Sequence, residues 1–218
     1  MKKSIETIWK EGFLNSDSIV TPKLNNLYNK KSEHIVDKFI RMFKINLVAI
    51  TIGSVFILAM SWLVHIPYMG IGFFVLLNTL AYFNFKLRVG SNKIDKNVNS
   101  YQYLKSFDLW LNEMISINQK FSRIFYPLAI LSVVAGFWFG EIGGDIPGEN
   151  FVQFLLEQFP NMILVFGFPL YLLIGLFTFL ALIAYSAGTI YKWDLNIVYG
   201  RIFKKLDEIL ADMEELRS

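Results

Sequence analysis

The stretch from Ile45 to Phe85 is 41 residues long and contains no Asp, Glu, Lys or Arg. A single break at His65-Ile66-Pro67 divides it into two apolar runs, each about long enough to cross a bilayer. Uncharged runs of this length are hard to bury in one soluble domain, and they are typical of transmembrane helices. We therefore expect a helical hairpin in lipid.

The composition agrees with a membrane protein. Charged residues make up 18% of the 218 residues, against about a quarter in soluble domains. The chain has no cysteine, which excludes disulfides, thiolate metal sites and cysteine nucleophiles. No apolar core with a cleavage site follows the basic N-terminus, so we expect no signal peptide.

Two later stretches, residues 124–140 and 159–191, are also free of charge. Together with the first stretch they predict four transmembrane helices, at about 45–65, 69–85, 124–140 and 162–187. We expect Pro127 and Pro169 to kink the last two spans, which membrane helices tolerate.

Small residues recur every four positions in the third span, at Ser132, Gly136 and Gly140. They lie on one helix face and predict a close approach to another helix.

The segments outside the spans also have helical patterns, at 22–44, 86–123 and 188–218. Thr21-Pro22 is a good helix start, and no breaker follows before the first span. We expect the second helix to continue beyond Lys86 to a turn near 97–100, with Gly90-Ser91-Asn92 as the alternative stop.

Apolar residues follow a 4-3-4 spacing in two of these segments, which is typical of a coiled coil or bundle helix. Residues at this spacing form an apolar seam along one helix face. If that seam were exposed, it would indicate a homodimer, and if it were buried within one chain, it would indicate a monomeric bundle. The seam residues are Tyr103, Phe107, Trp110, Met114, Ile202, Leu206, Ile209 and Met213.

The segment 141–160 is the only sizeable loop on its side. Gly143-Gly144 and Pro147-Gly148 are turn signals. The apolar, aromatic stretch Phe151 to Phe159 predicts a short helix at the membrane surface.

All 21 Lys and Arg residues fall in three segments, 1–44, 86–123 and 192–218. The positive-inside rule therefore predicts that both termini are cytoplasmic, in a bacterial inner membrane. The predicted fold is an all-α integral membrane protein, whose four transmembrane helices (within 21–218) extend into a cytoplasmic helical stalk.

Residues 1–20 form a separate amphipathic segment, with Ile5, Ile8, Trp9 and Phe13 on one helix face. This face has three alternative roles: it lies on an anionic membrane surface, docks on a partner, or packs on this protein's own cytoplasmic helices.

No residue pattern indicates catalysis or a cofactor. His34 and His65 fall on opposite sides of the predicted membrane, so they do not form a metal site. Basic residues alternate with acidic ones, which favours lipid headgroups over nucleic acid as a direct partner. We expect no enzyme activity.

Asn78 is the deepest amide in the predicted spans. It either forms a hydrogen bond between helices or lines a small pathway. Because the spans contain no charged residue, coupled transport is disfavoured and a passive channel stays open.

The opening Ser4-Ile5-Glu6-Thr7-Ile8-Trp9-Lys10, followed by a charged segment and membrane helices, resembles the start of certain small membrane proteins of Bacteroidota. Those are encoded beside extracytoplasmic-function sigma factors and are suspected to act as anti-sigma factors. The resemblance covers about the first 50 residues. This chain departs from that pattern in its four spans, its small external part and its lack of a Cys/His motif.

The leading hypothesis is a non-catalytic inner-membrane protein that binds a cytosolic partner through its cytoplasmic helices, as an anti-sigma-like regulator would. The alternative is a small passive channel or transporter.

Overall fold

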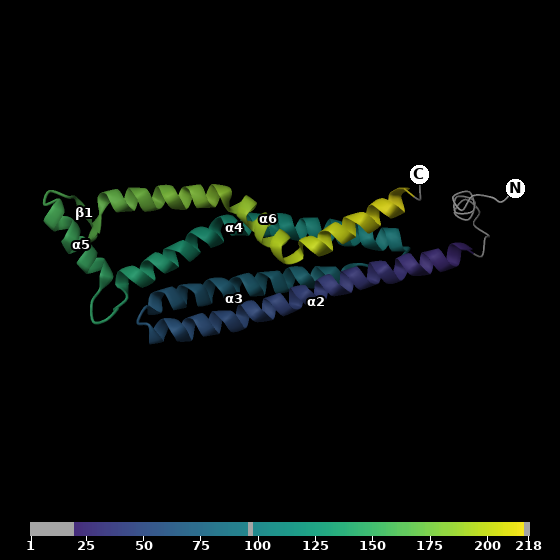
Figure 1. Ribbon diagram of the computed structural model, residues 1–218, viewed down its shortest axis with the longest axis horizontal. Coiled ribbons are helices and arrows are strands. Elements are labelled where there is room, and N and C mark those ends of the chain that lie inside the picture. Colours follow the sequence, from purple (N-terminus) through teal and green to yellow (C-terminus); the bar gives the residue numbers. More distant parts are fainter. Residues whose placement is uncertain (1–19, 96–97, 216–218) are drawn as a thin grey trace. The chain divides into compact units, whose positions relative to one another are not determined.

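The computed structural model describes residues 20–95 and 98–215, and these residues fold almost entirely into helices (Figure 1). The predicted all-α fold is therefore confirmed, apart from one small hairpin. The elements are α2 (Val20–Leu63), α3 (Pro67–Val89), the 3₁₀ turn η1 (Gly90–Lys93), α4 (Ser100–Phe139), α5 (Pro147–Gln158), β1 (Leu164–Val165), β2 (Phe168–Pro169) and α6 (Leu170–Glu215).

Four of these helices, α2, α3, α4 and α6, are long and apolar enough to cross a membrane. Each contains most or all of one of the four predicted spans. The three longest also continue into the charged segments, because no glycine pair or helix-stopping proline interrupts them. Length and composition thus support the prediction of a membrane protein.

The second helix ends earlier than we expected. The α-helix of α3 stops at Val89, and η1 replaces the predicted continuation towards residue 97. Ser91 Oγ donates a hydrogen bond to the carbonyl of Arg88 at 2.8 Å, and such side-chain bonds compete with the helical backbone pattern. Gly90 adds conformational freedom at the same point. The alternative stop at 90–92 was therefore the correct one.

The start of the last helix was also predicted wrongly. Residues 164–169 form the antiparallel hairpin β1–β2, and α6 begins only at Leu170. Phe166 and Gly167 both have positive φ, at 50° and 80°, as a two-residue hairpin turn requires. Pro169 consequently ends β2 and does not kink a span.

The loop between α4 and α6 contains more structure than predicted. Ile142 pairs with Asp145 across Gly143-Gly144, whose φ values are positive, so the expected turn is present. Pro147-Gly148 is different: it begins α5, because proline fits the first turn of a helix. The predicted short helix is confirmed and starts four residues earlier than Phe151.

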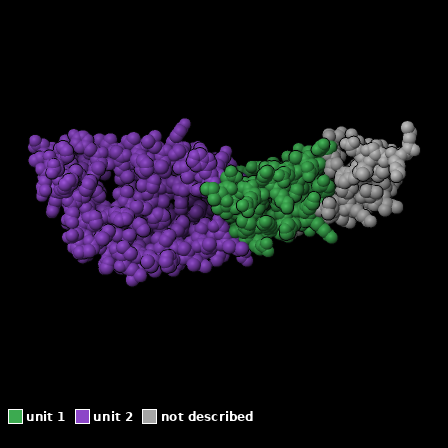
Figure 2. All heavy atoms as spheres, viewed as in Figure 1, with its two compact units in different colours: residues 1–43, 88–113, 196–218 green, residues 44–87, 114–195 purple. Residues whose placement is uncertain are grey.

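The chain divides into two compact units, coloured separately in Figure 2. Unit 1 comprises residues 1–43, 88–113 and 196–218, and unit 2 comprises residues 44–87 and 114–195. The uncharged stretches therefore belong to unit 2. The predicted seams fall mainly in unit 1.

Inside unit 2, α3 and α4 approach each other closely along the predicted small-residue face. A Cβ added to Gly136 would lie 2.4 Å from Met69 Cβ, and one added to Gly72 of α3 would lie 2.3 Å from Ser132 Oγ. Neither distance leaves room for a side chain. These glycines therefore set the separation of the two helices, as small residues do in membrane bundles.

Candidate functional site

The core of unit 1 forms around one phenylalanine. Phe39 of α2 has no exposed surface. Its ring centroid lies 5.6 Å from that of Phe107 on α4 and 5.1 Å from that of Tyr199 on α6. Aromatic pairs at these distances contribute beyond their buried area. Three segments that are distant in the sequence therefore meet at one side chain.

The predicted seam lies inside this single chain. Every seam residue is buried except Trp110, which is half-buried, and Met114 belongs to unit 2. Leu104 and Leu111 on α4 are also buried, at 0% and 3% exposure, so the core is wider than the seam. Burial of these residues within one chain is the arrangement expected for the monomeric alternative.

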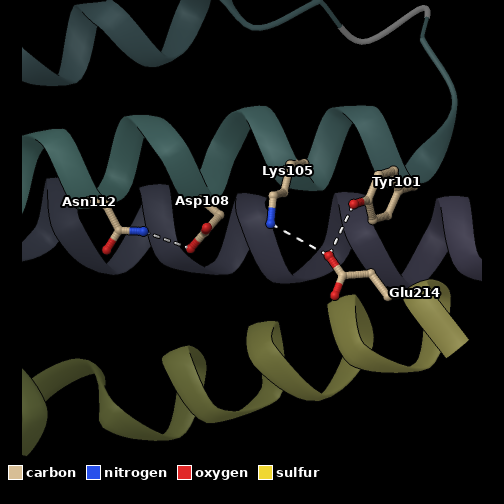
Figure 3. Close-up of polar contacts among 5 residues, drawn as sticks. All are labelled: Tyr101, Lys105, Asp108, Asn112 and Glu214. Carbon is tan, nitrogen blue, oxygen red and sulfur yellow. Dashed lines mark hydrogen bonds and ion pairs between the residues drawn. The ribbon is translucent and has the colours of Figure 1, made fainter.

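Polar contacts join the first turns of α4 to the last turn of α6 (Figure 3). The Tyr101 hydroxyl donates to Glu214 Oε1 at 3.0 Å, and Lys105 Nζ lies 3.5 Å from the same oxygen. Both charged side chains are about half exposed. Exposed ion pairs contribute at most about 1 kcal/mol, so this contact aligns the helices and stabilises them little.

Carboxylates accumulate at the C-terminal end of α6, which carries five of them and no Lys or Arg between 206 and 215. Partial burial raises the pKa of Asp207, and repulsion from Asp108 on α4 raises it further. Burial likewise raises the pKa of Tyr103, with Asp37 and Glu33 adding to the shift. The C-terminal end of α6 is therefore acidic, and two of its carboxylates, Glu208 and Glu214, have lysine partners in Lys204 and Lys105.

A small polar cavity of about 50 Å³ lies in unit 1 between α2 and the start of α4. Ser32 Oγ is fully buried beside it and has no hydrogen-bond partner in the described part of the chain. Glu33 and Ser100 also line it. Its size and polarity fit ordered water, which commonly satisfies such buried hydroxyls.

Asn78, the deepest amide in the predicted spans, connects α3 to α2. Its Nδ2 donates to Ser54 Oγ at 2.8 Å and to the carbonyl of Phe74 at 2.7 Å. Ser54 is fully buried and itself donates to the carbonyl of Thr51. The Asn78 amide thus serves as a contact between helices, as such amides often do in membrane proteins.

A pair of buried amides, which the sequence pattern did not predict, joins α4 to α3. Asn118 Nδ2 on α4 donates to Asn84 Oδ1 on α3 at 2.9 Å, and both residues are almost fully buried. Asn118 Oδ1 has no hydrogen-bond partner among the described residues. A nearby contact from Gln119 Nε2 to the carbonyl of Gly188 joins α4 to α6. The Asn84–Asn118 contact depends on how α3 and α4 align, which the sequence pattern does not give.

No group of three or more His, Cys, Asp or Glu residues that could hold a metal ion occurs within residues 20–95 and 98–215. The predicted partner-binding residues Ile5, Ile8, Trp9 and Phe13 lie outside the described residues. A scan against protein-family models, a search of curated proteins and a search of solved structures each found no match.

Proposed function

We propose that this chain is a non-catalytic multi-pass protein of a bacterial inner membrane, which binds a cytosolic protein through the helices of unit 1. The observation that carries the proposal is the acidic end of α6, where residues 206–215 carry five carboxylates and no Lys or Arg. These carboxylates would attract a basic surface on a partner.

The distribution of charge supports the proposed orientation. Residues 45–85 and 124–191 contain no Lys or Arg, and all 21 basic residues lie outside them. With both termini in the cytoplasm, unit 1 faces the cytosol, where a regulated protein would be found.

The partner class that the opening motif favours is a sigma factor, so the narrower proposal is an anti-sigma-like regulator. Unit 1 suits a regulator because its apolar seam is already buried within the chain. The surface left for docking is polar and charged, and such surfaces contribute specificity and association rate more than raw affinity.

Photo-cross-linking in native membranes tests the proposal. A photoreactive amino acid replaces Ala211, which is exposed on the acidic end of α6, and a matched one replaces Gln153, which is exposed on α5. We expect a basic cytosolic protein to be captured at position 211 and not at position 153.

Charge variants complete this experiment. The triple variant Asp207→Asn, Glu208→Gln, Asp212→Asn should reduce capture at position 211. A control triple, Asp145→Asn, Glu149→Gln, Glu157→Gln, removes as many carboxylates from the other end and should leave capture unchanged. Equal capture at positions 211 and 153, or capture that ignores the α6 charges, would contradict the proposal.

The alternative function, a passive channel or transporter, has less support. Both observed bonds of Asn78 Nδ2 are made within the helix pair α2–α3, which favours packing over a polar pathway. Solute flux through liposomes that Asn78→Leu alters would restore this alternative.

A further inference from the structure

An apolar cavity of about 560 Å³ lies in unit 2, where the end of α5 meets the start of α6. Leu155, Met162 and Leu172 contribute apolar side chains to its wall. Pro169, at the end of β2, also lines it. Its volume falls within the range of about 300–1,000 Å³ that is typical of pockets for small ligands. The cavity therefore has room for a ligand with an apolar chain.

The rim of this cavity combines two amides with exposed aromatic rings. Gln158 and Asn161 both line it and are exposed. Phe159 and Tyr171, which also line it, are 64% and 72% exposed. Tyrosine, with its amphipathic ring, concentrates at the level of lipid headgroups. An apolar wall with an amphipathic rim matches the two parts of a phospholipid.

The position of the cavity indicates where such a lipid would come from. Tyr171 and Leu172 belong to the first turn of α6, and the exposed Ile174 and Phe177 follow on the same helix. On the proposed function, that apolar surface faces acyl chains from its first turn onward. The cavity therefore continues directly from a lipid-facing surface.

Charge narrows the class of headgroup. The loop and α5 carry Glu141, Asp145, Glu149 and Glu157, and no Lys or Arg occurs between 124 and 191. An anionic headgroup would be repelled by these carboxylates, whereas an ammonium group would be attracted. Glu157 directly precedes Gln158 of the rim, although it does not line the cavity itself. A primary ammonium can also donate hydrogen bonds to the side-chain oxygens of Gln158 and Asn161, which the quaternary ammonium of phosphatidylcholine cannot.

We propose that this cavity binds one phospholipid whose headgroup carries a primary ammonium, of the phosphatidylethanolamine type. An acyl chain occupies the space between Leu155 and Leu172, and the headgroup lies at Gln158 and Asn161. The inference rests on the proposed membrane location and is independent of any cytosolic partner.

Photolabelling of the full chain in phosphatidylcholine nanodiscs tests this assignment. A minor fraction of phosphatidylethanolamine with a photoreactive acyl chain serves as the probe, and mass spectrometry locates the label. We expect several-fold more label on residues 155–172 than on residues 174–185. Unlabelled phosphatidylethanolamine should remove this excess, and phosphatidylglycerol at the same fraction should not.

Two matched variants separate the cavity from general lipid contact. Leu172→Trp places a bulky ring in the cavity and should reduce the excess, while Leu182→Trp, at a leucine that is 61% exposed on the same helix, should preserve it. Asn161→Ala changes only an exposed rim residue and should weaken the preference for the ammonium lipid without affecting folding.

The outcomes also separate this proposal from the proposed function. Label spread evenly over 155–185, or an excess that Leu172→Trp leaves intact, would overturn the cavity assignment in a protein that has inserted. Equal competition by both lipids would overturn the ammonium assignment. A chain without label at 174–185 has not inserted, which would contradict the membrane location itself.

Discussion

The two units use the same helices, α2, α4 and α6, in opposite ways. Unit 1 buries large apolar side chains such as Phe39, Phe107 and Leu206 and exposes charged ones. Unit 2 buries small or polar residues such as Ser54, Asn84 and Ala187 and some aliphatic ones such as Leu47 and Met114, but no aromatic ring among its described residues. Its exposed surface is apolar and includes large side chains: Ile45, Phe56, Leu63, Tyr68, Phe177 and Tyr185.

This reversal indicates that the two units fold against different surroundings. In water, burial of apolar surface is the main driving force, so the largest rings belong inside. In lipid that force is absent between helices, and close packing with a few interhelical hydrogen bonds takes its place. The burial pattern of unit 2 is therefore independent support for its proposed place in a bilayer.

The largest expected effect follows from the core of unit 1. Phe39→Ala removes the ring that α4 and α6 contact, and we expect a loss of about 3–5 kcal/mol in the free energy of unfolding. Phe177→Ala is the matched control in unit 2, at a ring that is 65% exposed, and should change stability by at most about 0.5 kcal/mol. Reversible unfolding in micelles, followed by circular dichroism, measures both. Equal losses of unfolding free energy in the two variants would contradict the claim that large rings are buried in unit 1 and exposed in unit 2.

A second prediction concerns glycine in unit 2. Gly136→Leu forces a side chain into the space of Met69, and we expect a cost of about 1–3 kcal/mol from overpacking. Gly175→Leu is the control, because a Cβ there meets nothing within 4 Å. Thermal unfolding in the same micelles compares the two variants. If Gly175→Leu destabilises the protein as much, the close approach of α3 and α4 does not explain the loss of stability in Gly136→Leu.

The smallest expected effect comes from Asp207. Its pKa is raised in the folded state, so ionisation of this group disfavours folding. That penalty begins as the pH rises past the ordinary aspartate pKa and is complete above the raised folded pKa. Asp207→Asn should therefore stabilise the protein at pH 7 by a few tenths of a kcal/mol, a size typical of exposed charge pairs. The gain should vanish below the ordinary aspartate pKa of about 4. Unfolding measured across pH tests this, and a gain that persists in acid would point to another cause.

Much of the helical architecture could be predicted because it depends on local patterns. The lengths of the uncharged stretches predicted all four apolar helices. The small residues at 132 and 136 marked the face of α4 that meets α3, while Gly140 lies beyond the end of α4, against the turn between α2 and α3. The seam spacing selected residues that the structure buries, but it omitted Leu104 and Leu111, since a three-helix core buries a wider face than a two-helix seam.

The features that were missed depend on backbone detail or on tertiary register. The hairpin before α6 lies in an apolar run, and only Gly167 and Pro169 hinted that Phe166 would take a positive φ. The Asn84–Asn118 pair depends on how α3 and α4 align, which one sequence does not contain. The apolar cavity likewise forms only when α5 and α6 meet.

Single-cysteine labelling tests the central claim most directly, because the natural chain has no cysteine. Asp145→Cys and Glu157→Cys probe the loop and α5, while Lys105→Cys and Glu208→Cys probe unit 1. In intact spheroplasts, a membrane-impermeant maleimide should label the first two at once and the last two only after the membrane is permeabilised. Labelling of position 105 or 208 in intact spheroplasts would contradict the account.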